Sequence, residues 1–514
     1  MLFSLNKNKK STFTASSMQG ANNANYPTIT CFGGVGSVTG ANFMLKVPKP
    51  MSKNEEGVLS NESGKVQHFY TMLIDCGLVQ GSREAEKFNR EPFGYDPTQV
   101  DTLLITHAHL DHVGRIGKLV KEGFSGRIIS SHATKDLAEL VMRDAAHIQA
   151  HDAKKNNLEP LYTEAEVDKA LSLWITFGYH EKFEPIEGYS AVTCVMKDAG
   201  HILGSSTFTF TVPVPSEEKS SGSISKTETR NIVFTGDLGN TPTPILSDSE
   251  FIDDADYMLI ESVYGDRNHE PKSERREKFK QVVQESLERR GTLVIPAFSV
   301  ERTQVILYEI NDLVETGQIK SVPVYLDSPL ASQVTSVYHK NIALFNPEVQ
   351  ERIRKGDDIF NFPKLTIVAS DHDSKSVHNV PGPKIIIAGS GMSMGGRVRR
   401  HEADYLPYKE NTILLVGFQP IGTLGRTIQD GAKKVNIDGV SVPVLARIES
   451  IFGYSAHKDS DHLVEFVSHS VGRLKQVFVA MGEPKSSLFL AQRINDELDV
   501  KAMYPERGTE YQIK

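Results

Sequence analysis

Seven consecutive residues, THAHLDH from Thr106 to His112, hold three histidines and one aspartate. They follow directly on an apolar run that predicts a short buried strand. His107 and His109 alternate along an extended segment, so both rings can point to the same side. Asp111 and His112 follow at the turn and can reach the same space from its other side. Imidazole and carboxylate groups are the usual ligands of catalytic zinc, so the motif indicates a metal site.

A pair of zinc ions needs more ligands than this motif offers, and the sequence supplies two candidates. His201 in DAGHILGS and Asp237 in FTGDLG each follow a strand-like segment. Both lie beside glycines, where the backbone can approach a metal closely. The simpler interpretation of the motif is a polar turn with solvent-exposed histidines. The H-x-H-x-D-H pattern with both downstream partners favours the metal site instead.

The length of the chain, 514 residues, predicts more than one domain. Strands separated by turn signals dominate the first half, and from Tyr264 onward strands alternate with helices, which is typical of a parallel α/β domain. We therefore predict the following division: a disordered leader at 1–26, a first domain at 27–262 that resumes at 445–514, and an inserted α/β domain at 263–444. Polar segments at 50–67 and 216–230 predict loop insertions. The segment around the single tryptophan, Trp174, predicts packing within a helical core.

Composition and charge exclude several classes of protein. No apolar run is long enough to predict a membrane span, and the polar N-terminal segment lacks the core of a signal peptide. The three cysteines are too few for a disulfide framework, which fits a reducing cytoplasm. Because the net charge is -8, a nucleic acid would have to be bound in a local basic groove rather than by the surface as a whole.

Further motifs make the chain resemble a known family. HAHLDH, DAGHILGS and FTGDLG are similar to successive motifs of the metallo-β-lactamase superfamily, and LIDCG around Asp75 resembles its first motif. The segments IESVYGDR, PAFSVERTQ, LDSPLA, GSGMSMGGRV, GFQPIGTLGR and GYSAHKD resemble blocks of the β-CASP nucleases, in particular the RNA-processing nucleases similar to the cleavage and polyadenylation factor. This resemblance implies a metallo-β-lactamase αβ/βα sandwich with an inserted β-CASP α/β domain.

The resemblance also implies metal ligands. One zinc ion would be held by His107, His109 and His201, a second by Asp111 and His112, and Asp237 would bridge the two. Asp75 would orient the ligands from behind, as carboxylates behind metal-bound histidines commonly do.

One position departs from the family pattern. Where the family usually has a histidine in VHGE as a further ligand of the second zinc, this chain reads VFVAMGE and places Met481. A thioether is a weak ligand for zinc. The second zinc site is therefore expected to be weak or completed by water.

The catalytic and substrate-binding residues follow from the same resemblance. His457 would be the general acid, Glu261 would hold it, and Asp111 would act with them. The residues expected to line the substrate groove are Arg302, Ser328, Arg397 and Arg426. Arg397, Arg399 and Arg400 follow a glycine-rich stretch, and this leaves two interpretations open: a solvated basic helix start, or contacts to backbone phosphates.

The expected activity is zinc-dependent cleavage of single-stranded RNA, by an endonucleolytic or a 5′-exonucleolytic route, in a protein whose relatives are often homodimers. Three alternatives stay open. DNA is one, because a DNA-processing member of the family also lacks a histidine at the position of Met481. A small-molecule hydrolase is another, although the inserted domain argues against it, and a non-catalytic RNA-binding scaffold is the third, although it has no need of the metal ligands.

His147 and His151, one helical turn apart, lack the glutamate of an H-E-x-x-H site, which favours an exposed helix surface.

Overall fold

The computed structural model describes residues 25–50, 69–81, 83–216, 227–417, 419–420 and 422–514. The predicted leader lies almost entirely outside the described residues, and so do most residues of the two predicted loop insertions. No described helix is both long enough and apolar enough to cross a membrane. All three cysteines are buried and free.

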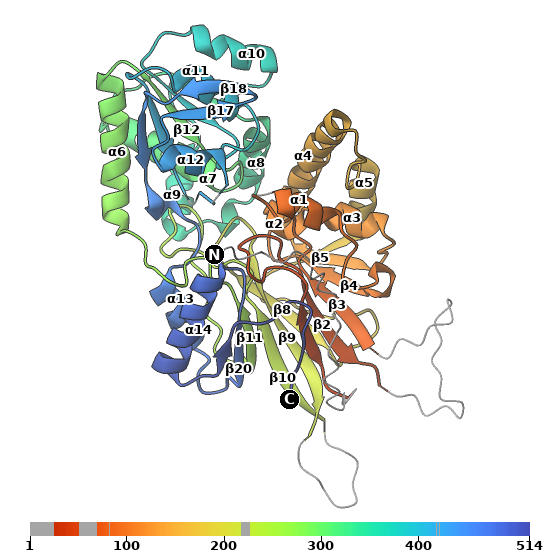
Figure 1. Ribbon diagram of the computed structural model, residues 1–514. Coiled ribbons are helices and arrows are strands. Elements are labelled where there is room, and N and C mark those ends of the chain that lie inside the picture. The colour runs from red at the N-terminus through yellow and green to blue at the C-terminus, as the bar shows by residue number, and fades with distance from the viewer. Residues whose placement is uncertain (1–24, 51–68, 82, 217–226, 418, 421) are drawn as a thin grey trace, which may run out of the picture.

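Two seven-stranded sheets pack face to face and form a sandwich (Figure 1). The first has the order β22-β1-β2-β3-β4-β5-β6, and the second has the order β21-β20-β11-β10-β9-β8-β7. The strands of the first sheet are β1 (Thr28–Cys31), β2 (Phe43–Pro48), β3 (Phe69–Ile74), β4 (Thr102–Leu104), β5 (Arg127–Ser131), β6 (Trp174–Phe177) and β22 (Glu510–Gln512). Those of the second are β7 (Lys182–Phe183), β8 (Thr193–Asp198), β9 (Ser206–Pro215), β10 (Thr227–Phe234), β11 (Tyr257–Ile260), β20 (Gln476–Val479) and β21 (Ala502–Met503).

The sandwich is held together by an apolar cluster between its sheets. Alternate residues of β9, such as Phe208 and Phe210, are buried in this cluster, which also contains Phe43 and Ile74 of the first sheet. A one-residue shift of β9 would expose those rings, so the alternation fixes the register of the strand.

Helices cover the outer face of each sheet (Figure 1). Those on the side of the first sheet are α1 (Arg83–Arg90), α2 (Leu110–Val113), α3 (Ile116–Lys121), α4 (His132–Asn156) and α5 (Glu164–Ser172). Those on the side of the second sheet are α13 (Ser460–Ser468) and α14 (Pro484–Leu498). The prediction for Trp174 was wrong, because α5 ends at Ser172 and Trp174 begins strand β6. The β-branched residues after it pair with β5, and the indole donates a hydrogen bond to Ser130 Oγ at 2.9 Å.

The inserted unit contains a six-stranded parallel sheet with the order β14-β13-β15-β12-β16-β19. Its strands are β12 (Thr292–Pro296), β13 (Val324–Asp327), β14 (Leu365–Ile367), β15 (Lys384–Ala388), β16 (Thr412–Leu415) and β19 (Arg447–Ser450), and a hairpin is formed by β17 (Lys434–Ile437) and β18 (Val440–Pro443). Its helices are α6 (Lys272–Glu288), α7 (Arg302–Glu315), α8 (Pro329–Lys340), α9 (Pro347–Arg354), α10 (Asp371–Ser376), α11 (Val398–Tyr405) and α12 (Leu424–Gln429).

The predicted end of the inserted domain, residue 444, falls too early for this sheet. Strand β19 lies beyond it and pairs in parallel with β16, which makes β19 an edge strand of the inserted sheet. The two units also share an apolar cluster that includes Leu137 and Leu246 of the sandwich together with Tyr338 and Phe345 of the inserted unit.

Candidate metal centre and active site

The predicted metal ligands follow strands that end at one edge of the sandwich. In the first sheet β3 and β4 are parallel, so Asp75 after β3 and His107 after β4 emerge at the same edge. In the second sheet β10 and β11 are parallel, which brings Asp237 and Glu261 to a common edge as well. The functional side chains therefore meet because their strands run in the same direction.

Three histidines and one carboxylate converge at this edge, and we call these four residues the metal group. His107, His109, His201 and Asp237 each offer one ligand atom, and these atoms all lie within 4.8 Å of one another. His109 Nδ1 is 3.1 Å from His107 Nε2 and 3.2 Å from His201 Nε2. Asp237 Oδ2 is 3.6 Å from the Nε2 atoms of both His107 and His201.

Asp75 lies behind this group and fixes the neighbouring loop. Its Oδ1 accepts a hydrogen bond from the Thr106 backbone at 2.8 Å, and its Oδ2 accepts one from Thr106 Oγ1 at 2.8 Å. His112 Nδ1 lies 2.7 Å from the same Oδ2. His112 Nε2 then points to Asp237 Oδ2, which is 3.4 Å away. Thr106, which the sequence analysis did not single out, is thus part of the support for the ligands.

The donor set fits a bound metal ion. Burial lowers the pKa of His109 to about 3 and those of His107 and His201 well below the usual range, so these rings are neutral, which is the form that binds a metal. Although burial alone would lower the pKa of His112, the carboxylates of Asp237 and Asp75 raise it well above its usual value. Its buried Nε2 lies 3.4 Å from Asp237 Oδ2 but makes no well-aligned hydrogen bond among the described residues. A cation that replaced the proton on this nitrogen would contact both Nε2 and the adjacent carboxylate.

A second group shares Asp237 with the first. Asp237, Glu261 and His457 also have ligand-type atoms within 4.8 Å of one another. His457 Nδ1 lies 3.2 Å from both carboxylate oxygens of Glu261, which is fully buried and also accepts a hydrogen bond from the Leu238 backbone at 2.6 Å. Burial alone would lower the pKa of His457, but Glu261 and Asp237 raise it to about 9.

Asp111 and Met481 are placed differently from the other predicted residues. Asp111 belongs to neither group of ligand-type atoms in the described chain, although burial raises the pKa of its carboxyl to about 6 against the opposing charge of His112. Met481 follows β20, next to β11, but its side chain is buried in the apolar cluster between the sheets. The structure therefore gives Met481 an apolar environment that the sequence analysis did not anticipate.

The four predicted groove residues fall into two sets. Arg302 begins α7 and lines a small cavity of about 20 Å³ together with His201 of the metal group. Burial lowers its pKa to about 10. The other three form contacts within the inserted unit: Ser328 caps α8, Arg397 pairs with Asp327 at 2.7 Å, and Arg426 pairs with Asp430 at 2.9 Å. Their roles toward a substrate stay predictions.

The remaining basic and histidine motifs have simple environments. Arg399 pairs with Asp438 at 3.0 Å and Arg400 pairs with Asp371 at 2.6 Å, and both interpretations of this stretch stay open. His147 and His151 are exposed on α4, as predicted.

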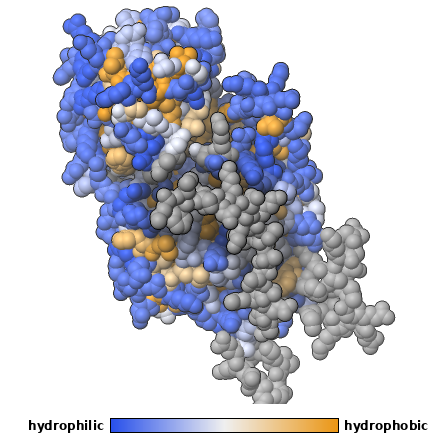
Figure 2. Space-filling view, viewed as in Figure 1, coloured by the Kyte–Doolittle hydropathy of each residue, from blue (hydrophilic) through white to orange (hydrophobic). Residues whose placement is uncertain are grey.

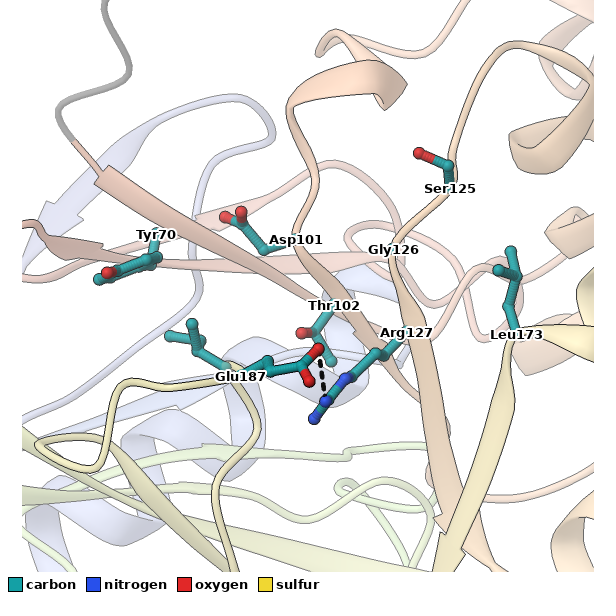
Figure 3. A pocket seen from close by; sticks show the side chains of 9 residues that line it. Tyr70, Asp101, Thr102, Ser125, Gly126, Arg127, Leu173 and Glu187 are labelled. Atoms are coloured by element: carbon teal, nitrogen blue, oxygen red, sulfur yellow. Dashed lines mark ion pairs between the residues drawn. The ribbon is translucent and has the colours of Figure 1, made fainter. Parts of the chain in front are cut away.

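A larger cavity of about 410 Å³ lies at the opposite end of the first sheet (Figure 3). Its lining includes Tyr70 at the start of β3 and Thr102 at the start of β4. Arg127 and Glu187, which face each other in the view, form an ion pair at 2.6 Å. The cavity contains none of the predicted ligands, so we locate the functional site at the edge with the histidines.

Comparisons with known proteins agree with this geometry. The model of the metallo-beta-lactamase superfamily matches residues 70–285, that of the Beta-Casp domain matches residues 303–428, and that of the Zn-dependent metallo-hydrolase RNA specificity domain matches residues 441–505.

Three relatives match most of the chain. Ribonuclease TTHA0252 of Thermus thermophilus is 34% identical, with 82% of this chain and 90% of that protein covered. The RNase J-like protein of Methanocaldococcus jannaschii is 29% identical, with 85% and 93% covered. Transcription termination factor FttA of Methanosarcina mazei is 30% identical, with 84% of this chain but 66% of that protein covered. The chain belongs to the metallo-β-lactamase superfamily, in the branch that carries an inserted β-CASP domain.

Proposed function

We propose that this protein is a zinc-dependent ribonuclease that hydrolyses phosphodiester bonds of single-stranded RNA. The observation that carries the proposal is the pair of side-chain groups that share Asp237: a metal-type group with His107, His109 and His201, and a proton-donor group with Glu261 and His457. The names of the relatives, among them a ribonuclease and an RNase J-like protein, support RNA as the substrate.

The proposed roles follow from the contacts. His107, His109, His201 and Asp237 would hold one zinc ion, and His112 with Asp111 and Asp237 would hold a second. When bound, zinc would supply an activated water and neutralise charge at phosphorus. Asp75 orients His112 by accepting from its Nδ1.

The proton for the leaving oxygen would come from His457. Its Nδ1 faces Glu261, which leaves Nε2 as the nitrogen that donates to the substrate. Arg302, buried beside His201, would contribute positive charge near the phosphate backbone of the bound RNA.

Removal of the metal ligands tests the proposal. We expect the double variant His107→Ala with His109→Ala to lose both zinc, measured by elemental analysis, and cleavage of a labelled RNA oligomer. The matched control replaces His147 and His151, which are exposed on α4, and should retain both properties. Cleavage by purified protein that contains no transition metal would contradict the mechanism.

The choice of nucleic acid is tested separately. Single-stranded RNA and DNA oligomers of the same sequence are compared under the same conditions, and we expect faster cleavage of RNA. A preference for DNA would leave the proposed mechanism of hydrolysis unchanged but would contradict RNA as the substrate.

A further inference from the structure

The chain passes between its two units twice, and the two passages run side by side. The outgoing passage (262–271) connects β11 to α6, and the return passage (451–459) connects β19 to α13. Tyr264 and Asp459 form a parallel bridge between them, and the Ser460 backbone, at the start of α13, donates to the Arg267 carbonyl at 3.1 Å. We call residues 262–271 and 451–461, which add the first two residues of α13 to the return passage, the double passage.

His457 lies on the return passage, and its backbone is held on two sides. Toward the sandwich, the flanking Lys458 N–H donates to the Leu238 carbonyl at 2.8 Å, and the Asn240 N–H donates to the Ala456 carbonyl at 2.8 Å. Toward the outgoing passage, the carbonyl of His457 itself accepts a hydrogen bond from His269 Nε2 at 2.9 Å.

His269 is in turn fixed in place. Its backbone N–H donates to Asp459 Oδ2 at 3.2 Å, and its ring packs against that of Tyr264 with 4.3 Å between centroids. Because a carbonyl oxygen can only accept, Nε2 of His269 carries a proton, and a neutral ring is sufficient for this contact.

We propose that His269 is a positioning residue, which holds the backbone carbonyl of His457 and thereby keeps the ring of the proton donor aligned with the metal group. This inference rests on the proposed function. The ring of His457 is joined to its backbone through a single methylene group, so a rotation of the peptide plane moves Nε2. A displacement of about 1 Å in a reacting group can cost about a hundredfold in rate.

The neighbouring Asn268 offers a matched control. It is exposed, its Nδ2 donates to Asp461 Oδ2 at 2.6 Å, and its Oδ1 accepts from the Asp461 backbone at 3.2 Å. Asn268→Ala therefore removes a connection of the double passage without removing the hydrogen bond to the His457 carbonyl. His269→Gln keeps a side-chain N–H donor near the position of Nε2 and serves as the conservative variant.

The test compares an RNA oligomer with the same oligomer in which sulfur replaces the leaving oxygen. A thiol, with a pKa of about 8.5, departs as a thiolate without a proton donor. We expect His269→Ala to slow cleavage of the oxygen substrate by about tenfold and that of the sulfur substrate by less than about twofold, with zinc content unchanged. His269→Gln should recover most of the rate, and Asn268→Ala should match the parent on both substrates.

The contrary results are distinct. An equal loss on both substrates, the parent rate in His269→Ala, or no recovery in His269→Gln would overturn the positioning role. His457→Ala is measured alongside and should lose about a hundredfold or more on the oxygen substrate alone. If His457→Ala shows no difference between the substrates, the proton-donor role in the proposed function fails. If His457→Ala loses rate on the oxygen substrate alone but His269→Ala does not, only the positioning role of His269 fails.

Discussion

Met481 illustrates how one side chain can serve packing instead of chemistry. It follows β20 at the end of the sandwich that carries the ligands, yet its thioether is buried in the apolar cluster with Phe43 and Phe234. Its backbone N–H donates to the Gly34 carbonyl at 2.6 Å, so the position is also held by the main chain. A flexible apolar side chain suits an irregular gap of this kind.

A histidine at this position would face two opposing effects. In the metal-free protein, Met481→His places a polar ring in an apolar cluster, and we expect a loss of about 1–3 kcal/mol of stability. If the new ring reaches the proposed second zinc, zinc should restore the melting temperature, and more zinc should be retained under a chelator. Met481→Leu is the control and should cost less than about 1.5 kcal/mol. Unchanged zinc retention in Met481→His would show that residue 481 does not face the metal.

The loops that carry the candidate ligands depend on close contacts with neighbouring backbone. Gly77, just after β3, lies against the turn that holds Asp111: a Cβ atom built on Gly77 would be 1.4 Å from the Asp111 carbonyl oxygen. Only glycine fits there, because the obstacle is backbone rather than a movable side chain.

We therefore expect Gly77→Ala to displace the turn and to weaken zinc binding by about tenfold or more, with every ligand side chain intact. Retention of zinc under a chelator measures the effect. Gly472→Ala is the control, since a Cβ at Gly472 meets nothing within 4 Å. Equal retention in the two variants would contradict the argument.

Helix α11 of the inserted unit buries an acid. Glu402 is fully buried and accepts a hydrogen bond from Ser393 Oγ, and burial raises its pKa from 4.5 to about 8. The folded protein therefore keeps the Glu402 carboxyl protonated up to a higher pH than the unfolded chain does. The contribution of this protonated carboxyl to the free energy of unfolding is complete below about pH 4.5 and declines as the pH rises to about 8.

This decline should disappear in Glu402→Gln, which cannot lose the proton. We expect the melting temperature of the variant to fall less than that of the parent between pH 5 and pH 8, as measured by calorimetry. Glu410→Gln, at an exposed glutamate close by, should follow the parent. Parallel curves for Glu402→Gln and the parent would show that Glu402 is already ionised in the folded protein.

The elements also show what could be predicted from sequence. Local patterns were sufficient for strands such as β9 and β11 and for placing the candidate ligands just after strands, because each signal lies within a few residues. Trp174 was misassigned because the spacing of the preceding helix continues into it, whereas pairing with β5 decides its structure. His269 was missed because a lone histidine in a polar turn has no local signal, and only the fold brings it to His457.

At the scale of the whole molecule, the two units are joined by more than the double passage. Leu246 of the sandwich and Phe345 of the inserted unit form an isolated antiparallel bridge and belong to one apolar cluster. Figure 2 shows that the visible surface is mainly hydrophilic, with scattered apolar patches. The shared cluster predicts that both units unfold together.

Trp174 allows this to be tested, because the only tryptophan lies in the sandwich. Phe345→Ala removes a buried ring from the inserted unit and should cost about 3–5 kcal/mol. We expect the unfolding midpoint reported by Trp174 fluorescence to fall accordingly, and to fall less in Phe345→Leu. An unchanged midpoint would mean that the units unfold independently.

The order of the ligands along the chain has a consequence during synthesis. The residues of the metal group are complete once Asp237 has left the ribosome, but His457 and strand β20 emerge only after the entire inserted unit has been made. With the proposed roles, a nascent chain would carry every ligand of the first zinc ion well before it carries the proton donor. For the proposed ribonuclease, the full rate of cleavage would therefore have to wait until the inserted unit has been made and the chain is nearly complete.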